Sequence, residues 1–296
     1  MNPVRFLPPK PYRWQPVPLV WGSVALHVLV VVAWWAGASA HVFWLMGLNH
    51  LLLAALTLWP SNPWLDHAHT RLPEAAAQRG WVALTLDDGP DPVVTPQVLD
   101  ILEAHGARAS FFCIGHKVRR HPELVREIVR RGHSVENHGD AHAHSFAFWG
   151  PERMRKDIAA CQQTIFEACG QWPRYFRPTA GFRPPWLDWV MARMGLRQVL
   201  WSARAFDTCK QSPGRVVKNL CARLKPGGVI LLHDGNSPVD ADNQALVVKV
   251  LPELLSALRQ AHCVCVPLSQ AMEPAPSHAA TGAVSAFLPQ RTTDPP

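Results

Sequence analysis

The feature that most constrains this 296-residue chain is a long stretch near its N-terminus without charged side chains. No Lys, Arg, Asp or Glu occurs between Arg13 and Asp66. Within it, the apolar segments Leu19–Ala38 and His41–Trp59 are each long enough, at about 1.5 Å rise per residue, to cross a hydrocarbon layer of about 30 Å. Residues 37–40 can form the turn between them. The sequence therefore predicts a two-helix transmembrane hairpin.

Two other interpretations of this stretch stay open. Ala38-Ser39-Ala40 resembles a signal-peptidase site, although the apolar segment before it is longer than a usual signal-sequence core and a second apolar segment follows at once. Alternatively, the second segment is a buried helix of the soluble part. That arrangement would leave a single span and move the soluble part to the other side of the membrane.

The charges that flank the predicted hairpin set its orientation. Arg5, Lys10 and Arg13 precede the first span and the turn carries no Lys or Arg, so the N-terminus is expected to stay cytoplasmic. A hairpin then returns the chain to the cytoplasm. The seven cysteines are odd in number and scattered, which fits a reducing compartment better than a disulfide framework. We predict a multi-pass protein of the bacterial inner membrane whose soluble part faces the cytoplasm.

Beyond residue 80, apolar strand-like runs alternate with helical stretches. The predicted strands are Trp81–Asp88, Ala109–Gly115, His133–Asn137, Arg174–Pro178, Arg197–Trp201, Gly228–His233 and Cys263–Val266. The predicted helices are Thr95–His105, Pro122–Arg131, Pro151–Cys169, Trp186–Met194, Pro213–Leu224 and Asn243–Ala261. Such alternation predicts a parallel α/β barrel or a doubly wound sheet. In both architectures, functional residues gather at the carboxyl ends of the strands.

These patterns divide the chain into five parts. We expect a basic N-terminal segment at 1–17, two transmembrane helices at 18–60, a linker at 61–80, a catalytic domain at 81–270 and a tail at 271–296. The tail is rich in Pro, Ala, Ser and Thr, and we expect it to be disordered.

Polar residues follow most of the predicted strands. They are Asp87 and Asp88 in "TLDDGP", His138 and His142 in "NHGDAH", Arg177 in "FRP", Asp207 in "AFDT" and His233 in "LLHDG". Two histidines four residues apart with a nearby carboxylate match the sets that hold zinc or another divalent ion and leave positions open for water and substrate. One of two adjacent carboxylates can bind metal while the other takes a proton. Each motif alone has an ordinary structural explanation, such as a turn, but their shared place at strand ends favours a site.

With these motifs, the chain from about Trp81 to Leu268 resembles the polysaccharide deacetylase family, also called the NodB-homology or fourth carbohydrate esterase family. The resemblance implies an α/β fold, a distorted (β/α) barrel of about seven parallel strands, here preceded by the two-helix transmembrane hairpin. It also implies metal-dependent hydrolysis of the N-acetyl group of an amino sugar.

The resemblance implies a role for each of the strand-end residues. The implied roles are catalytic base for Asp87, metal ligand for Asp88, His138 and His142, and general acid for His233. Arg177 is expected to pair with Asp207 and to orient the base. A backbone N–H near Ala180 is expected to help hold the oxyanion. We expect a divalent metal ion, zinc first, with cobalt, nickel or manganese as alternatives.

Three positions depart from the family pattern. Thr179-Ala180 replaces the usual Pro-Tyr, Thr208 replaces a Trp, and Arg204 replaces an earlier Asp of the same segment. The positions that carry the chemistry are kept, whereas groups that usually wall the sugar site are not. The resemblance therefore supports the family's reaction more than it supports any of the family's substrates.

The expected substrate is an N-acetylated amino-sugar glycan or glycolipid, lipid-linked or in the cell envelope, and membrane lipid is an expected partner. If only one span crosses, a periplasmic peptidoglycan or exopolysaccharide deacetylase is expected instead. A catalytically silent sugar- or lipid-binding membrane scaffold is the alternative from a different class.

Part of the net charge of +7 lies on a predicted helical face that carries Arg119, Arg126 and Arg130. This face is either solvated or in contact with anionic lipid headgroups or a substrate phosphate. Because no nucleic-acid recognition module accompanies the charge, nucleic-acid binding is not expected.

Overall fold

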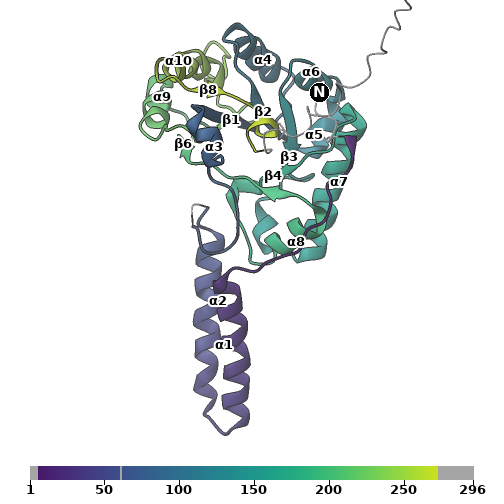
Figure 1. Ribbon diagram of the computed structural model, residues 1–296, viewed down its shortest axis with the longest axis vertical. Helices are drawn as coiled ribbons and strands as arrows, with labels where there is room; N and C mark the ends of the chain where they lie inside the picture. The colour runs from purple at the N-terminus through teal and green to yellow at the C-terminus, as the bar shows by residue number, and fades with distance from the viewer. Residues whose placement is uncertain (1–5, 61, 273–296) are drawn as a thin grey trace, which may run out of the picture.

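The computed structural model describes residues 6–60 and 62–272 (Figure 1). Two antiparallel helices, α1 (Pro18–Trp35) and α2 (Phe43–Thr57), project as a rod from a rounded α/β domain. A short 3₁₀ turn, η2 (Ala40–Val42), precedes α2. The predicted tail lies almost wholly outside the described residues.

The rod is apolar on its outside. Trp35 is 81% exposed and Leu51 is 67% exposed, so these large side chains have no protein core around them. An amide of Asn49 donates a hydrogen bond to the Ser23 hydroxyl across the two helices (2.7 Å). Helix α1, and α2 together with η2, are each long and apolar enough to cross a membrane. In this structure the second apolar segment is not a buried helix of the domain.

One curled parallel sheet forms the core of the domain. Its strands are β1 (Trp81–Asp87), β2 (Ala109–Cys113), β3 (Ser134–Asn137), β4 (Tyr175–Phe176), β5 (Arg197–Gln198), β6 (Ala203–Arg204), β7 (Val229–His233) and β8 (Val264–Cys265). Seven of them follow the order β5-β4-β3-β2-β1-β7-β6, and β8 pairs with the start of β1. The predicted barrel-like α/β fold is confirmed. Each predicted run contains a strand, and the two-residue strand β6 was not predicted.

Helices cover the outside of this sheet (Figure 1). They are α4 (Val94–Ala104), α5 (Gly115–Arg120), α6 (Pro122–Arg130), α7 (Pro151–Cys169), α8 (Leu187–Met194), α9 (Pro213–Cys221) and α10 (Leu246–Gln260). Two short helices, α3 (Glu74–Gln78) and α11 (Leu268–Ala271), pack instead with Ala83 on the inner face of β1. Two 3₁₀ turns, η3 (His144–Phe148) and η4 (Thr179–Gly181), follow β3 and β4. All six predicted helices are present, and the short helices α3, α5 and α11 were not predicted.

The alternation of side chains along β1 decides what faces the barrel interior. Val82, Leu84 and Leu86 belong to the main apolar cluster, which is formed with the surrounding helices. Thr85 and Asp87 therefore point to the opposite side, into the barrel, and both are almost fully buried. A strand buried on both faces is typical of a parallel sheet, and here it delivers a carboxylate to the carboxyl end of the sheet.

The N-terminal segment runs along α8 before it enters the rod (Figure 1). The backbone N–H of Tyr12 donates to the Ala192 carbonyl (3.0 Å), and the Trp14 indole donates to Asp188 (3.1 Å). The open end of the rod thus lies against the domain.

We call residues 57–60 and 62–66, where the chain leaves α2, the hairpin base. Arg183, which follows η4, is buried and forms an ion pair with Asp66 of the hairpin base. Its Nη2 also donates to the carbonyls of Pro60 (3.1 Å) and Asn62 (2.7 Å), and its backbone N–H donates to the Thr57 carbonyl (3.1 Å). The rod is therefore joined to the loop that follows β4.

Candidate active site

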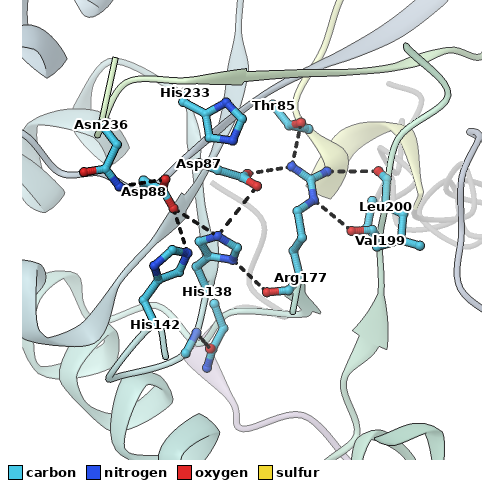
Figure 2. A network of polar contacts seen from close by, with 12 residues as sticks. Thr85, Asp87, Asp88, His138, His142, Arg177, Val199, Leu200, His233 and Asn236 are labelled. Atoms are coloured by element: carbon cyan, nitrogen blue, oxygen red, sulfur yellow. Dashed lines mark hydrogen bonds and ion pairs between the residues drawn. The ribbon is translucent and has the colours of Figure 1, made fainter. Parts of the chain in front are cut away.

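The sheet brings the predicted site residues to one end of the barrel (Figure 2). Asp87 is in register with His233 across the β1–β7 pair. Asn137 is in register with Phe176 across β3–β4, so the residues that follow, His138 and Arg177, emerge at the same level. The structure thus gathers side chains that are far apart in the sequence, as the strand-end pattern predicts.

Asp88, His138 and His142 form a compact cluster. The Oδ1 atom of Asp88 lies 3.2 Å from Nε2 of His138 and 3.0 Å from Nε2 of His142. One potential ligand atom from each residue lies within 4.8 Å of the others. The other oxygen of Asp88 accepts a hydrogen bond from the Asn236 amide (2.9 Å). Asp88 and His142 both have a positive φ, 71° and 49°, which turns these side chains toward one another.

The hydrogen bonds around this cluster fit a bound cation. Nδ1 of His138 lies 2.7 Å from the Arg177 carbonyl, so this nitrogen carries the proton and donates it there. Nε2 then presents a lone pair toward Asp88 Oδ1, which is buried without a hydrogen-bond partner in the described part of the chain. Two acceptors that face each other require a positive charge between them. Two imidazoles and one carboxylate are donors that suit zinc and similar divalent ions.

Electrostatics in the cluster point the same way. Burial acts to raise the pKa of Asp88, but His138 and His142 outweigh it and hold that pKa well below its usual range. Burial lowers the pKa of His142, which keeps its imidazole neutral, as a metal ligand must be. Burial alone would also lower the pKa of His138, but Asp87 and Asp88 raise it instead. The two carboxylates therefore draw positive charge to this point.

Asp87 is held by a buried arginine. Arg177 is fully buried, and its Nη1 lies 2.6 Å from Asp87 Oδ1. Its remaining hydrogen bonds go to the Thr85 hydroxyl (2.9 Å) and to the carbonyls of Val199 and Leu200 (both 3.0 Å). The second oxygen of Asp87 lies 3.7 Å from Nε2 of His138. Arg177 thus fixes one oxygen of the carboxylate and leaves the other facing the cluster (Figure 2).

A second carboxylate–histidine pair completes the site. Nδ1 of His233 lies 3.0 Å from Asp207 Oδ1, and the His233 backbone N–H donates to Asp207 Oδ2 (2.8 Å). Burial acts to lower the pKa of His233, but Asp207 outweighs it and the pKa is raised. The imidazole is therefore biased toward its protonated form, as a proton donor requires.

The predicted Arg177–Asp207 pair is wrong. Arg177 follows β4 and reaches across the barrel interior to Asp87 at the end of β1. Asp207 follows β6, and β6 is the neighbour of β7, so Asp207 meets His233 instead. The order of strands in the sheet, which the sequence does not reveal, decides the partners of Arg177 and of Asp207.

Several residues of the site were not predicted. The Thr85 hydroxyl accepts a hydrogen bond from Arg177. The Asn236 amide donates one to Asp88. Asp234 directly follows His233, burial raises its pKa to about 7, and the Thr95 hydroxyl donates a hydrogen bond to it (2.5 Å). Arg183 belongs to a second Phe-Arg-Pro tripeptide, residues 182–184, and this repeat of the Arg177 motif is the one signal that points to it.

The basic face has local partners. Arg119 pairs with Asp140 (2.6 Å), Arg130 pairs with Glu127 (2.6 Å), and Arg126 donates to the Ala168 carbonyl (3.3 Å). All seven cysteines lie in the described residues and are free thiols.

The fold and the site define a class of protein: a curled parallel α/β sheet with a candidate Asp/His/His metal site beside a carboxylate that an arginine holds. Residues 75–199 match the family model described as polysaccharide deacetylase. A chitooligosaccharide deacetylase of Bradyrhizobium is 36% identical over 199 residues, which cover 64% of this chain and 89% of that protein. The structure of the Bc1960 peptidoglycan N-acetylglucosamine deacetylase has a TM-score of 0.62 at 28% identity, and the match covers 69% of this chain and 92% of that one.

The chain therefore belongs to the polysaccharide deacetylase family and is a carbohydrate deacetylase. The fold by itself does not establish activity. BA3943 of Bacillus anthracis, described as a family pseudoenzyme, has a TM-score of 0.59 at 19% identity, with 70% of this chain and 67% of that one covered. Activity depends on the side chains at the carboxyl end of the sheet.

Proposed function

We propose that the chain hydrolyses the N-acetyl group of a glucosamine-type sugar in a lipid-linked or cell-envelope glycan, with a divalent metal ion, zinc first, as cofactor. The main support is Asp88 Oδ1, a buried oxygen without a hydrogen-bond partner among the described residues, which lies between two imidazole nitrogens. The sugar is inferred from relatives named as chitooligosaccharide and peptidoglycan N-acetylglucosamine deacetylases.

In this proposal Asp88, His138 and His142 would hold the ion, which when bound supplies Lewis-acid stabilisation of negative charge. Asp87 takes a proton from the attacking water at Oδ2, because Arg177 already occupies Oδ1. The water oxygen forms a bond to the acetyl carbon.

The second half of the reaction needs a proton donor, because an amide nitrogen leaves as an amine. His233 donates its Nε2 proton to that nitrogen as the carbon–nitrogen bond breaks, and Asp207 at Nδ1 stabilises the imidazolium before transfer. The N–H of Ala180, which donates no hydrogen bond within the described residues, is the proposed backbone donor to the tetrahedral oxyanion. The products are acetate and the free amino sugar.

Acetate release from N-acetylglucosamine oligosaccharides by the detergent-purified chain tests this function. We expect release to stop after chelation and to return with zinc, or with cobalt, nickel or manganese added separately. Release that continues in the fully chelated protein would contradict the metal role. Stoichiometric metal binding without release from any glycan or glycolipid would instead favour the silent scaffold.

We further propose that α1 and α2 cross the inner membrane and that the site faces the cytoplasm. The outward apolar side chains of the rod and the basic residues before it support this topology. A reporter pair fused after Gln270, one enzyme active only inside and one only outside the cytoplasm, tests it. An external signal would contradict the two-span hairpin and direct the substrate search to peptidoglycan or exopolysaccharide.

A further inference from the structure

A second arginine points into the barrel beside the site. Arg204 ends β6 and is in register with Leu231 of β7, which is itself in register with Thr85 of β1. Its neighbour Ala203 belongs to the apolar cluster under the helices. Because side chains alternate along a strand, Arg204 points to the opposite side, into the interior that also holds Thr85 and Asp87.

The charge of Arg204 is not neutralised by the chain. Within the residues that the structure describes, Arg204 forms no ion pair, and its Nε is buried without a hydrogen-bond partner. Arg177, the other arginine of the interior, has a carboxylate at 2.6 Å. Both guanidinium groups lie near the ring of Trp201, with Cζ of Arg177 5.8 Å and Cζ of Arg204 5.1 Å from its centroid. One positive charge in the barrel interior is thus left for a ligand.

Two aromatic rings hold the Arg204 guanidinium. Its Cζ lies 5.1 Å from the centroid of Trp201 and 4.7 Å from that of Phe206. Phe206 is 57% exposed, so the stacked guanidinium lies at an opening to solvent. Stacking on ring faces leaves the in-plane N–H donors of arginine available for an oxyanion.

This opening lies on the side of the site where the rod joins the domain. A Cβ added at Gly181 would lie 2.6 Å from the Trp201 ring and 2.9 Å from Cβ of Pro60. The Trp201 ring and Pro60 of the hairpin base therefore both lie against Gly181 of η4. Arg204, stacked on Trp201, is close to the end of α2, from which a lipid-linked substrate would approach.

We propose that Arg204 binds a phosphate group attached to the amino sugar, and so selects a sugar phosphate over a neutral glycan. The inference rests on the proposed function, whose substrate class it narrows. The recognised chemistry is the phosphate, whether it stands free on the sugar or links the sugar to a lipid. An unpaired, ring-stacked guanidinium matches two phosphate oxygens better than it matches a sugar hydroxyl.

Binding to the metal-loaded full-length chain in nanodiscs tests the inference without a need for turnover. The ligands are a neutral N-acetylglucosamine disaccharide, N-acetylglucosamine 1-phosphate, and the same sugar on a polyprenyl phosphate. The variants are Arg204→Gln and Arg204→Lys. Arg193→Gln is the matched control, because Arg193 is also stacked on a tryptophan, 5.5 Å from the Trp189 centroid, but on α8.

We expect Arg204→Gln to reduce the preference for the sugar phosphate over the neutral sugar by about 10- to 100-fold, the worth of one or two charge-assisted hydrogen bonds. Arg204→Lys should keep part of the preference, and Arg193→Gln all of it. An equal loss for the free and the polyprenyl phosphate would assign recognition to the phosphate in either source. A larger loss for the polyprenyl form would assign it to the lipid-linked source.

A preference that survives Arg204→Gln, or an equal weakening for charged and neutral sugars, would overturn the inference. Acetate release is measured on the same preparations. A wild-type chain that binds the sugar phosphate through Arg204 but releases no acetate would contradict the proposed function and leave the binding assignment in place.

Discussion

Arg177 and Arg183 lie on either side of η4, each in a Phe-Arg-Pro tripeptide, and each is buried against one aspartate. Both also donate hydrogen bonds to backbone carbonyls. They differ in what the aspartate does next. Asp87 keeps one oxygen toward the histidine cluster, whereas Asp66 belongs to the hairpin base. The same kind of ion pair thus holds the proposed catalytic base at one end of the loop and the base of the apolar rod at the other.

The largest expected effect comes from breaking the proposed metal cluster, which this loop contacts through the Arg177 carbonyl. His138→Ala removes one of three proposed ligands and the partner of the Arg177 carbonyl. We expect loss of stoichiometric metal and a fall of acetate release to background. Metal analysis and acetate assays on the same folded sample check this, and retention of both would contradict the cluster as the metal site.

The next effect comes from the other end of the loop. Asp66→Asn leaves Arg183 buried and unpaired, and breaking a buried pair in this way typically costs about 3–5 kcal/mol. We expect that loss in urea unfolding of the detergent-solubilised chain, with metal binding retained. Arg155→Gln is the control, because its partner Glu152 is exposed and such surface pairs contribute about 0–1 kcal/mol. Equal stability of the two variants would show that the Arg183–Asp66 pair does not stabilise the fold more than a surface pair does.

A smaller loss of stability is expected from a substitution in η4 itself, between Arg177 and Arg183. Gly181 has a φ of +75°, and an added Cβ would meet the Trp201 ring and Pro60. Gly181→Ala should therefore cost about 1–3 kcal/mol through backbone strain and overpacking. The matched substitution Gly150→Ala meets nothing within 4 Å and has a φ of −71°, so we expect little change there. Similar unfolding midpoints for both variants would show that η4 has more room than this packing allows.

The smallest effect concerns the pH profile. Asp207 raises the pKa of His233, and a proton donor is active below its pKa. Asp207→Asn should move the alkaline limb of kcat/KM to lower pH. Because folding raises the pKa of His233, the Asp207–His233 pair contributes to stability at low pH. That contribution is lost as pH rises through the raised pKa of His233. An alkaline limb that stays in place would argue against His233 as the donor.

Much of the site could be predicted from the sequence, because parallel strands end on one side of a sheet. The Asp88, His138 and His142 cluster and the long strands such as β1 follow from local patterns and from the family resemblance. Partners across the barrel do not. The Arg177–Asp207 pair was predicted wrongly, since it depends on which strands are neighbours.

Short elements and long-range pairs also escaped prediction. Strand β6, Ala203–Arg204, lies in the stretch "SARAF", which has no apolar run like those that predicted the equally short strands β4, β5 and β8. Arg183 and Asp66 are separated by more than a hundred residues, and only the fold shows that one buried charge needs the other.

The two adjacent aspartates have different proposed roles: Asp88 binds the metal ion, and Asp87 accepts the proton from water. Asp87→Asn is isosteric, removes the charge and leaves the cluster of Asp88, His138 and His142 in place. The most direct measurement is metal stoichiometry and acetate release on one sample of this variant. We predict full metal binding with turnover reduced by about 10²- to 10⁴-fold, the usual worth of a general base. Normal hydrolysis by Asp87→Asn would contradict the division of roles.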